Sequence, residues 1–254
     1  MVSSSGVLML GVAGLAAAGA GVFGRGLFMP RSQIFGKVAF RGDQNQPARI
    51  ALTFDDGPHP AVTPAILDWL GNHGVKAAFF IVGKHAAEHV DLVERIHGDG
   101  HIIGNHSYEH AHLGTMRGTS YWLREIGRSD DLIEQIIGKR PAMFRPPMGF
   151  KTHHLMRAAR QRGHTVVTWT RRGYDGVRTT SEQIVARLRQ PEAGDIVLLH
   201  DGAVAPFRVN VSATVQALDQ LLRHWASCGL AVQRLDTLLG IPAYARPSKE
   251  NGRH

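Results

Sequence analysis

Two adjacent carboxylates, Asp55 and Asp56, stand where the chain is expected to turn. Gly57 and Pro58 follow them directly, and both residue types favour turns. Adjacent carboxylates on a turn point in different directions, so one can bind a metal ion while the other stays free as a base. A purely structural acidic turn is the alternative. We favour chemistry because two acids directly after an apolar strand are hard to justify structurally.

A histidine pair offers further metal ligands. His106 and His110 are four residues apart, so on a helical turn their imidazoles face the same way and can share one zinc-type ion. The same spacing occurs at His85 and His89, which we assign to a solvated helix. The 106/110 pair is favoured because it comes directly after an expected strand at 101–103.

These side chains together favour a hydrolytic metal site. Two histidines and one aspartate leave positions open on a metal ion, as in catalytic rather than structural sites. Such an ion polarises a carbonyl and lowers the pKa of bound water. The second carboxylate can take the proton of that water, and His200 can protonate the leaving group. The predicted reaction is metal-assisted hydrolysis of an amide or ester.

Strands alternate with helices in the pattern that must position these groups. Apolar and β-branched runs predict strands at 50–54, 75–82, 100–103, 142–144, 165–169, 196–199 and 230–232. Helical periodicity lies between them, which implies a parallel sheet that is open or closed into a barrel. About seven such units approach a full barrel. The reactive residues follow strand ends, and in a barrel these positions converge on one face.

Composition excludes several classes of protein. Of 254 residues, 43% are hydrophobic and 20% charged, which rules out a disordered chain and a polytopic membrane protein. One cysteine, Cys228, rules out an internal disulfide. The net charge of +8 includes +4 in residues 1–49 and +2 in 241–254. Because the excess lies in the tails, we expect no nucleic-acid partner.

The N-terminus predicts membrane association. Residues 2–24 carry no charge, and a bilayer span needs about 20 apolar residues. We expect 1–25 to be a hydrophobic segment: a membrane anchor first, with a cleaved signal or a soluble apolar tail as alternatives. A connector at 26–47, a catalytic domain at 48–240 and a basic tail at 241–254 follow. Basic residues in 25–49 favour anionic lipid, so we expect membrane contact through 6–49 in the cell envelope, on a side left open.

The chain resembles the NodB-type polysaccharide deacetylases, carbohydrate esterase family 4, over about residues 48–240. The resemblance is carried, in chain order, by Thr53-Phe54-Asp55-Asp56-Gly57-Pro58, His106-Ser107-x-x-His110, Arg145-Pro146-Pro147 and Leu198-Leu199-His200-Asp201. It implies an α/β fold with one catalytic domain, a distorted (β/α)7 barrel. The implied activity removes the N-acetyl group from an N-acetyl amino sugar in a polysaccharide, peptidoglycan or lipid-linked glycan.

The resemblance also implies a division of roles at the reacting centre. Asp55 would be the general base and Arg145 would orient it. Asp56, His106 and His110 would bind a divalent metal: zinc first, with cobalt, nickel or manganese as alternatives. The partner would be an amino-sugar glycan. The alternatives are a deformylase of a lipid-linked aminosugar and a carbohydrate-binding pseudoenzyme.

The remaining implied roles concern the acid and the substrate. His200 would be the general acid, with Asp175 beside it to hold its charge. The backbone N–H of Met148 would help bind the oxyanion, and Leu199 would line the acetyl-methyl pocket. The family often has Asp-Trp in its fourth motif, and Tyr174 or Trp169 is the candidate replacement for that aromatic wall.

Three positions depart from the family pattern. Gly176 stands where the tryptophan often occurs, Arg172 where an acid often occurs, and Met148 where tyrosine or phenylalanine is common. The catalytic set is intact, while the walls that face substrate differ. These departures leave the reaction type in place and the substrate open.

Overall fold

The computed structural model describes residues 21, 24–44, 48–111, 114, 116–202 and 210–246. Within them, a parallel sheet has the strand order β5-β4-β3-β2-β1-β7-β6, and β8 pairs with β1. The strands are β1 (Arg49–Asp55), β2 (Ala78–Ile81), β3 (Ile102–Asn105), β4 (Met143–Phe144), β5 (Thr165–Val166), β6 (Arg171–Arg172), β7 (Ile196–His200) and β8 (Ala231–Val232). The expected α/β class and parallel sheet are confirmed.

β1 lies inside the sheet, between β2 and β7. All of its residues except Arg49 are buried, as expected for a parallel strand covered on both sides. The strands run in register, so Asp55 at the end of β1 is opposite Phe80 of β2 and His200 of β7. Parallel pairing therefore brings the ends of distant strands to one place.

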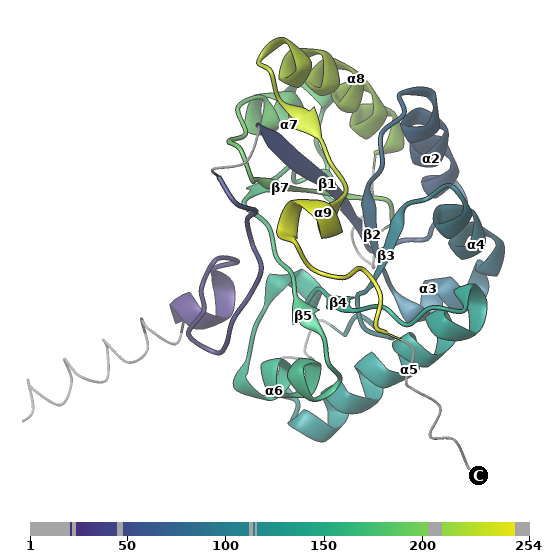
Figure 1. Cartoon of the computed structure of the whole chain (residues 1–254), viewed down its shortest axis with the longest axis vertical. Coiled ribbons are helices and arrows are strands. Elements are labelled where there is room, and N and C mark those ends of the chain that lie inside the picture. The colour runs from purple at the N-terminus through teal and green to yellow at the C-terminus, as the bar shows by residue number, and fades with distance from the viewer. Residues whose placement is uncertain are drawn as a thin grey trace, which may run out of the picture.

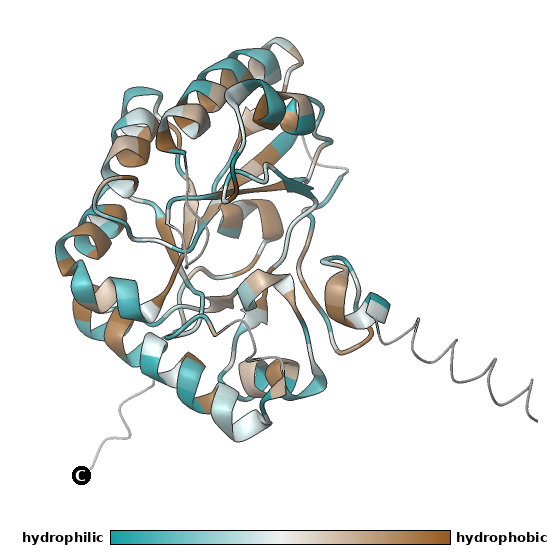
Figure 2. Ribbon diagram, turned by 180° about the vertical axis from the view of Figure 1, so that it is seen from behind, coloured by the Kyte–Doolittle hydropathy of each residue, from teal (hydrophilic) through white to brown (hydrophobic). Residues whose placement is uncertain are grey.

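Helices surround the sheet (Figure 1). They are α2 (Thr63–Asn72), α3 (Gly83–Glu88), α4 (Val90–Gly98), α5 (Thr119–Ile137), α6 (His153–Gln161), α7 (Ser181–Leu188), α8 (Val211–Ser227) and α9 (Leu235–Leu239). Their brown apolar residues mostly face the sheet and their teal polar residues mostly face outward (Figure 2). Burial of one helical stripe is the main source of helix stability in such a fold.

The short helix α9 was not predicted from the sequence, because five residues are too few for a clear period. Its Leu235 and Leu238 pack with Ala51 and Ile196, which lie near the beginnings of β1 and β7. This apolar cluster fills the end of the barrel opposite Asp55. The other end is thus the one that stays open for chemistry.

The sheet is a distorted barrel whose two edge strands are β5 and β6. The connector lies along this edge. Ala39 donates its N–H to the Val166 carbonyl at 2.8 Å and accepts from Thr168 at 2.9 Å, while Gly42 donates to Gly194 at 2.8 Å. These bonds make part of the expected 26–47 connector an element of the barrel wall.

The described chain ends extend the packing beyond the expected domain of 48–240. Tyr244 packs on the apolar cluster that contains Leu235, and its hydroxyl accepts from the Ile103 N–H at 3.2 Å. At the other end, the hydrophobic segment expected at 1–25 lies outside the described residues except for Gly21, Gly24 and Arg25. Among described helices, none has both the length and the apolar character that a bilayer crossing requires.

Candidate active site

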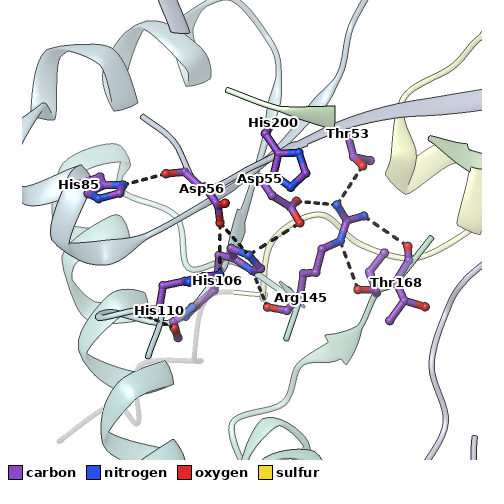
Figure 3. Close-up of polar contacts among 12 residues, drawn as sticks. Thr53, Asp55, Asp56, His85, His106, His110, Arg145, Thr168 and His200 are labelled. Carbon is purple, nitrogen blue, oxygen red and sulfur yellow. Dashed lines mark hydrogen bonds and ion pairs between the residues drawn. The ribbon is translucent and has the colours of Figure 1, made fainter. Parts of the chain in front are cut away.

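Side chains from four strand ends meet at the open end of the barrel (Figure 3). Asp55 ends β1 and His200 ends β7, while His106 follows β3 and Arg145 follows β4. All four are buried. The convergence expected from the sequence is therefore present, although these residues are separated by up to 145 positions in the chain.

Asp56, His106 and His110 form a candidate metal centre. The Asp56 Oδ1 lies 3.4 Å from His106 Nε2 and 3.2 Å from His110 Nε2, and one ligand atom from each residue lies within 4.8 Å of the others. One carboxylate oxygen and two imidazole nitrogens are the donors of catalytic zinc sites. The geometry distinguishes the roles of the two acids, because Asp56 lies close to both histidines and Asp55 does not.

The hydrogen bonding of His106 fits this assignment. Its Nδ1 lies 2.7 Å from the Arg145 carbonyl, which only accepts, so Nδ1 carries a proton. In the neutral ring, Nε2 then carries a lone pair, and this lone pair faces the acceptor oxygen of Asp56. Two acceptors at this distance need a cation between them, and a histidine held by a carbonyl is the usual metal ligand.

The charges at this centre agree with that reading. Burial alone would raise the pKa of Asp56, but the charges of His110, His200 and His106 and a hydrogen bond from His106 hold it well below its usual range. Burial would lower the pKa of His106, but the charges of Asp55 and Asp56 and the Arg145 carbonyl raise it. A cluster of acceptors that favours a proton is suited to a metal cation, which would replace that proton.

The backbone of the site is strained. Among the described non-glycine residues, those with positive φ are Asp56 (73°), Ser107 (67°), His110 (50°), Met148 (57°) and Tyr174 (58°). A non-glycine residue in this region costs on the order of 1–3 kcal/mol, and such residues cluster at functional sites. Every one of them is a predicted site residue or lies beside one.

Asp55 is held by a buried arginine. Arg145 Nη1 donates to Asp55 Oδ1 at 2.6 Å and to Thr53 Oγ1 at 2.9 Å, and its Nη2 donates to the Thr168 carbonyl at 3.3 Å. The guanidinium also lies over the Phe80 ring at 4.0 Å. These contacts fix one oxygen of Asp55, while its Oδ2 lies 3.7 Å from His106 Nε2 at the metal centre.

His200 and Asp175 form a second buried pair. His200 Nδ1 lies 2.8 Å from Asp175 Oδ1, which leaves Nε2 for a substrate. Burial alone would lower the pKa of His200, but the charge and hydrogen bond of Asp175, with the charges of Asp56 and Asp55, raise it to about 9. His200 is therefore suited to carry a proton at neutral pH.

A cavity of about 150 Å³ opens beside these groups. It is lined by Asp56, Met148, Arg172, Tyr174, Gly176, Val177 and His200. Met148 and Tyr174 thus lie where substrate contact was predicted. Leu199 is fully buried in the apolar core and is not part of this lining, so its expected contact with an acetyl methyl stays a prediction.

His85, assigned from the sequence to a solvated helix, is half-buried and has a contact with the site that the sequence did not show. It lies on α3, and its Nδ1 is 2.7 Å from the backbone carbonyl of Asp56 (Figure 3). The periodicity of so short a helix does not show which side is buried. His85 follows shortly after the strand Ala78–Ile81, and the other site residues also follow strand ends. This position was the sequence signal that could have placed His85 near the site.

Asp201 follows the strand 196–199 with His200, as the sequence indicated, but the sequence assigned it no role of its own. Thr63 donates to its Oδ2 at 2.7 Å, and Gly57 packs so closely on this carboxyl group that no Cβ would fit. Burial, with the charges of Asp56 and Asp55, raises the pKa of Asp201 to about 7, although the Thr63 hydrogen bond opposes the rise. Asp201 supports the turn that carries Asp56.

Comparison with known proteins agrees with this geometry. The profile of the family described as polysaccharide deacetylase matches residues 42–167. A peptidoglycan-N-acetylglucosamine deacetylase of Bacillus cereus is 32% identical over 213 residues, which are 84% of this chain and 73% of the relative. A chitooligosaccharide deacetylase of Azorhizobium caulinodans is 32% identical over 210 residues, covering 80% of this chain and 99% of the relative.

A solved structure extends the likeness to three dimensions. The Bc1960 peptidoglycan N-acetylglucosamine deacetylase, in complex with an N-oxidanyl-benzamide compound, superposes with a TM-score of 0.75 at 30% identity. The match covers 82% of this chain and 95% of that one. By sequence and by fold, the chain belongs to the polysaccharide deacetylases, carbohydrate esterase family 4.

Proposed function

We propose that this protein is a metal-dependent hydrolase that removes the N-acetyl group from an N-acetyl amino sugar of a polysaccharide, peptidoglycan or lipid-linked glycan. One observation carries the proposal. The Asp56–His106–His110 cluster lies beside Asp55, a carboxylate held by arginine, and shares a cavity with His200, an imidazole whose pKa is raised. Amide hydrolysis needs these three functions in one place: a metal site, a base and an acid.

Asp56, His106 and His110 would hold the ion, and zinc is the proposed metal because one carboxylate and two imidazoles suit it. Cobalt, nickel and manganese are the alternatives. When bound, the ion supplies Lewis-acid polarisation of the amide carbonyl and lowers the pKa of water.

Asp55 is the proposed base. The bond from Arg145 fixes its Oδ1, so Oδ2 is the oxygen that takes the proton of the attacking water. General-base catalysis of this kind contributes about 10²–10⁴ to the rate. Arg145 acts through Asp55 and is a positioning residue.

His200 is the proposed acid. Asp175 binds its Nδ1, so the Nε2 proton is the one delivered to the leaving amine nitrogen. The N–H of Met148 is proposed to donate to the developing oxyanion, since Met148 lines the cavity with His200. Tyr174, half-exposed in the same wall, is proposed to pack against a sugar ring, and Leu199 to contact the acetyl methyl.

A release assay tests the reaction. Purified protein loaded with zinc is incubated with N-acetylglucosamine oligomers and with peptidoglycan fragments, and released acetate and formate are measured separately. We expect acetate, and we expect Asp55→Asn to slow its release by about 10²–10⁴ while the protein stays folded. Formate without acetate would replace the proposal with the deformylase. Sugar binding with neither product would indicate the pseudoenzyme. The presence of an acid and a base argues against that outcome, because sugar binding alone needs neither.

The location in the cell envelope, attached by the N-terminal hydrophobic segment, is part of the proposal. The uncharged stretch at 2–24 is its support. Of the basic residues that follow, Arg41 is paired with Asp195 at 2.5 Å, so it contributes less to lipid attraction than its charge suggests. Protease treatment of intact spheroplasts, followed with an antibody to the C-terminus, tests the side. Protection means that the domain faces inward, and digestion means that it faces outward.

A further inference from the structure

Two neighbouring arginines on β6 differ in their partners. Arg171 is neutralised, because its Nε donates to Asp195 at 2.9 Å and its Nη2 lies 3.6 Å from Glu192. Arg172 has no ion pair within the described part of the chain, and its buried Nε has no hydrogen-bond partner there. Successive residues of a strand point to opposite faces, which explains why only one of them reaches the acidic residues.

Arg172 lies in the wall of the catalytic cavity, together with Asp56 and His200. Its guanidinium carbon is 4.9 Å from the centre of the Tyr174 ring and 5.7 Å from that of Trp169. Stacking on aromatic rings holds a guanidinium in one plane and leaves its N–H groups available at the edge. The rings therefore orient the cation without neutralising it.

The surroundings add positive charge and space. The guanidinium carbon of Arg187 lies 5.5 Å from the centre of the Tyr174 ring. Arg187 is fixed there because it donates hydrogen bonds to the Gly173 carbonyl and the Thr179 hydroxyl. A side chain at Gly176 would begin 3.4 Å from the His200 ring. The glycine thus leaves room beside the proposed acid for a substituent of the substrate.

An unpaired buried donor is unfavourable unless a ligand completes it. The planar fork of arginine matches carboxylate and phosphate oxygens by two parallel hydrogen bonds. A neutral sugar hydroxyl would not balance the charge of Arg172. An oxyanion that arrives with the substrate would match both the charge and the geometry of Arg172.

We propose that Arg172 forms an oxyanion subsite, so that the enzyme prefers an N-acetyl sugar that carries, or is bonded to, a carboxylate- or phosphate-bearing unit. This subsite rests on the proposed deacetylase function and specifies its substrate class. Carboxylate and phosphate share the same recognition chemistry, and the experiment separates them.

The test compares three disaccharide substrates of equal length, by acetate release from the zinc-loaded protein. They are neutral diacetylchitobiose, its 1-phosphate, and the disaccharide of N-acetylglucosamine and N-acetylmuramic acid, which bears a carboxylate. We expect kcat/KM for at least one anionic substrate to exceed the neutral one by about tenfold or more. Arg172→Gln should reduce this anionic-to-neutral ratio by a similar factor, and Arg172→Lys should restore part of it.

Arg178→Gln is the matched control, because Arg178 is exposed and does not line the cavity, and it should keep the wild-type ratio. Which anionic substrate loses its advantage in Arg172→Gln identifies carboxylate or phosphate as the ligand. A ratio that is unchanged in Arg172→Gln, or equal loss on all three substrates, would overturn the subsite while leaving deacetylation intact. No acetate from any substrate would instead refute the proposed function.

Discussion

Asp175 holds His200 at two points: its Oδ1 lies 2.8 Å from the ring Nδ1, and its Oδ2 accepts the His200 backbone N–H at 2.9 Å. A third bond, from the Thr214 hydroxyl at 3.3 Å, fixes the same carboxylate. The carboxylate thus determines both the orientation of the imidazole and its charge. Burial is the largest single influence on the pKa of His200 and lowers it, and the charge and hydrogen bond of Asp175 are the main influences that oppose it.

The alkaline side of the pH–rate profile should therefore depend on Asp175. His200 must be protonated to act as an acid, and its raised pKa keeps the proton on as the pH increases. Asp175→Asn removes the negative charge, so the alkaline limb should move to lower pH, by about 1–3 units. Measuring kcat/KM against pH at equal zinc loading checks this. Thr214→Val, which removes only a neutral hydrogen bond, should move the limb much less, and an unshifted limb in Asp175→Asn would show that the pair does not govern proton donation.

Metal content should separate the two adjacent acids. Asp56 contacts both histidines, whereas Asp55 is bound by Arg145. Asp56→Asn and His106→Ala should lose zinc, because each removes one of three ligands. Asp55→Asn should keep zinc and lose about 10²–10⁴ in turnover. Metal analysis of each purified variant, with circular dichroism as the folding control, decides the matter, and zinc-free Asp55→Asn protein would contradict the division of roles.

A buried acid on α5 should stabilise the loop that carries His106. Asp130 accepts from the Asn105 side chain at 2.7 Å and lies 3.0 Å from His164 Nε2, and its side chain is fully buried. Asp130→Ala should lower the free energy of unfolding by about 3–5 kcal/mol, because the remaining polar groups lose their partner inside the protein. Urea unfolding measures this.

The neighbouring residue of the same helix is the control for that experiment. Asp131 pairs with Arg140 at 2.6 Å, but its side chain is 65% exposed. Asp131→Ala should change the free energy of unfolding by no more than about 1 kcal/mol, as is usual for exposed ion pairs. Equal losses in the two variants would mean that helix propensity, rather than the buried network, accounts for the effect.

Lys151 should hold the N-terminal connector against the barrel. Its buried Nζ donates to the carbonyls of Met29 at 2.6 Å and Pro30 at 3.2 Å. Lys151→Met keeps most of the volume but removes both bonds, so tryptic cleavage after Arg31 should become several times faster. Lys84→Met, an exposed lysine on α3, should leave the cleavage rate at that of the wild type. Unchanged cleavage in Lys151→Met would mean that the other contacts of the connector suffice.

Much of the fold was predictable because its signals are local. The apolar run of β1 and the helical period of 119–137 each depend on residues close in the sequence, and burial of one face makes such patterns readable. The order of strands and helices in turn implied a parallel sheet, and parallel pairing implied that strand ends meet. These two inferences, the parallel sheet and the meeting of its strand ends, predicted which types of reactive side chain would lie together in the site.

The family resemblance already implied different roles for Asp55 and Asp56, but the physical reason for the difference lies in tertiary contacts. Asp55 and Asp56 are equivalent as sequence, and they differ because Arg145, ninety positions away from Asp55, binds one of them. The contact of His85 with the Asp56 backbone is likewise a long-range contact that no local period encodes.

The same holds at the edges of the fold. Basic residues are alike in the sequence, yet Arg171 finds Asp195 and Arg172 faces the cavity unpaired. Residues 39–42 read as a linker and become barrel wall because their backbone pairs with Val166 of β5 and with Gly194, just before β7. Sequence determined the elements and the reactive residue types, whereas three-dimensional proximity determined the partners, and partners set charge, protonation and role.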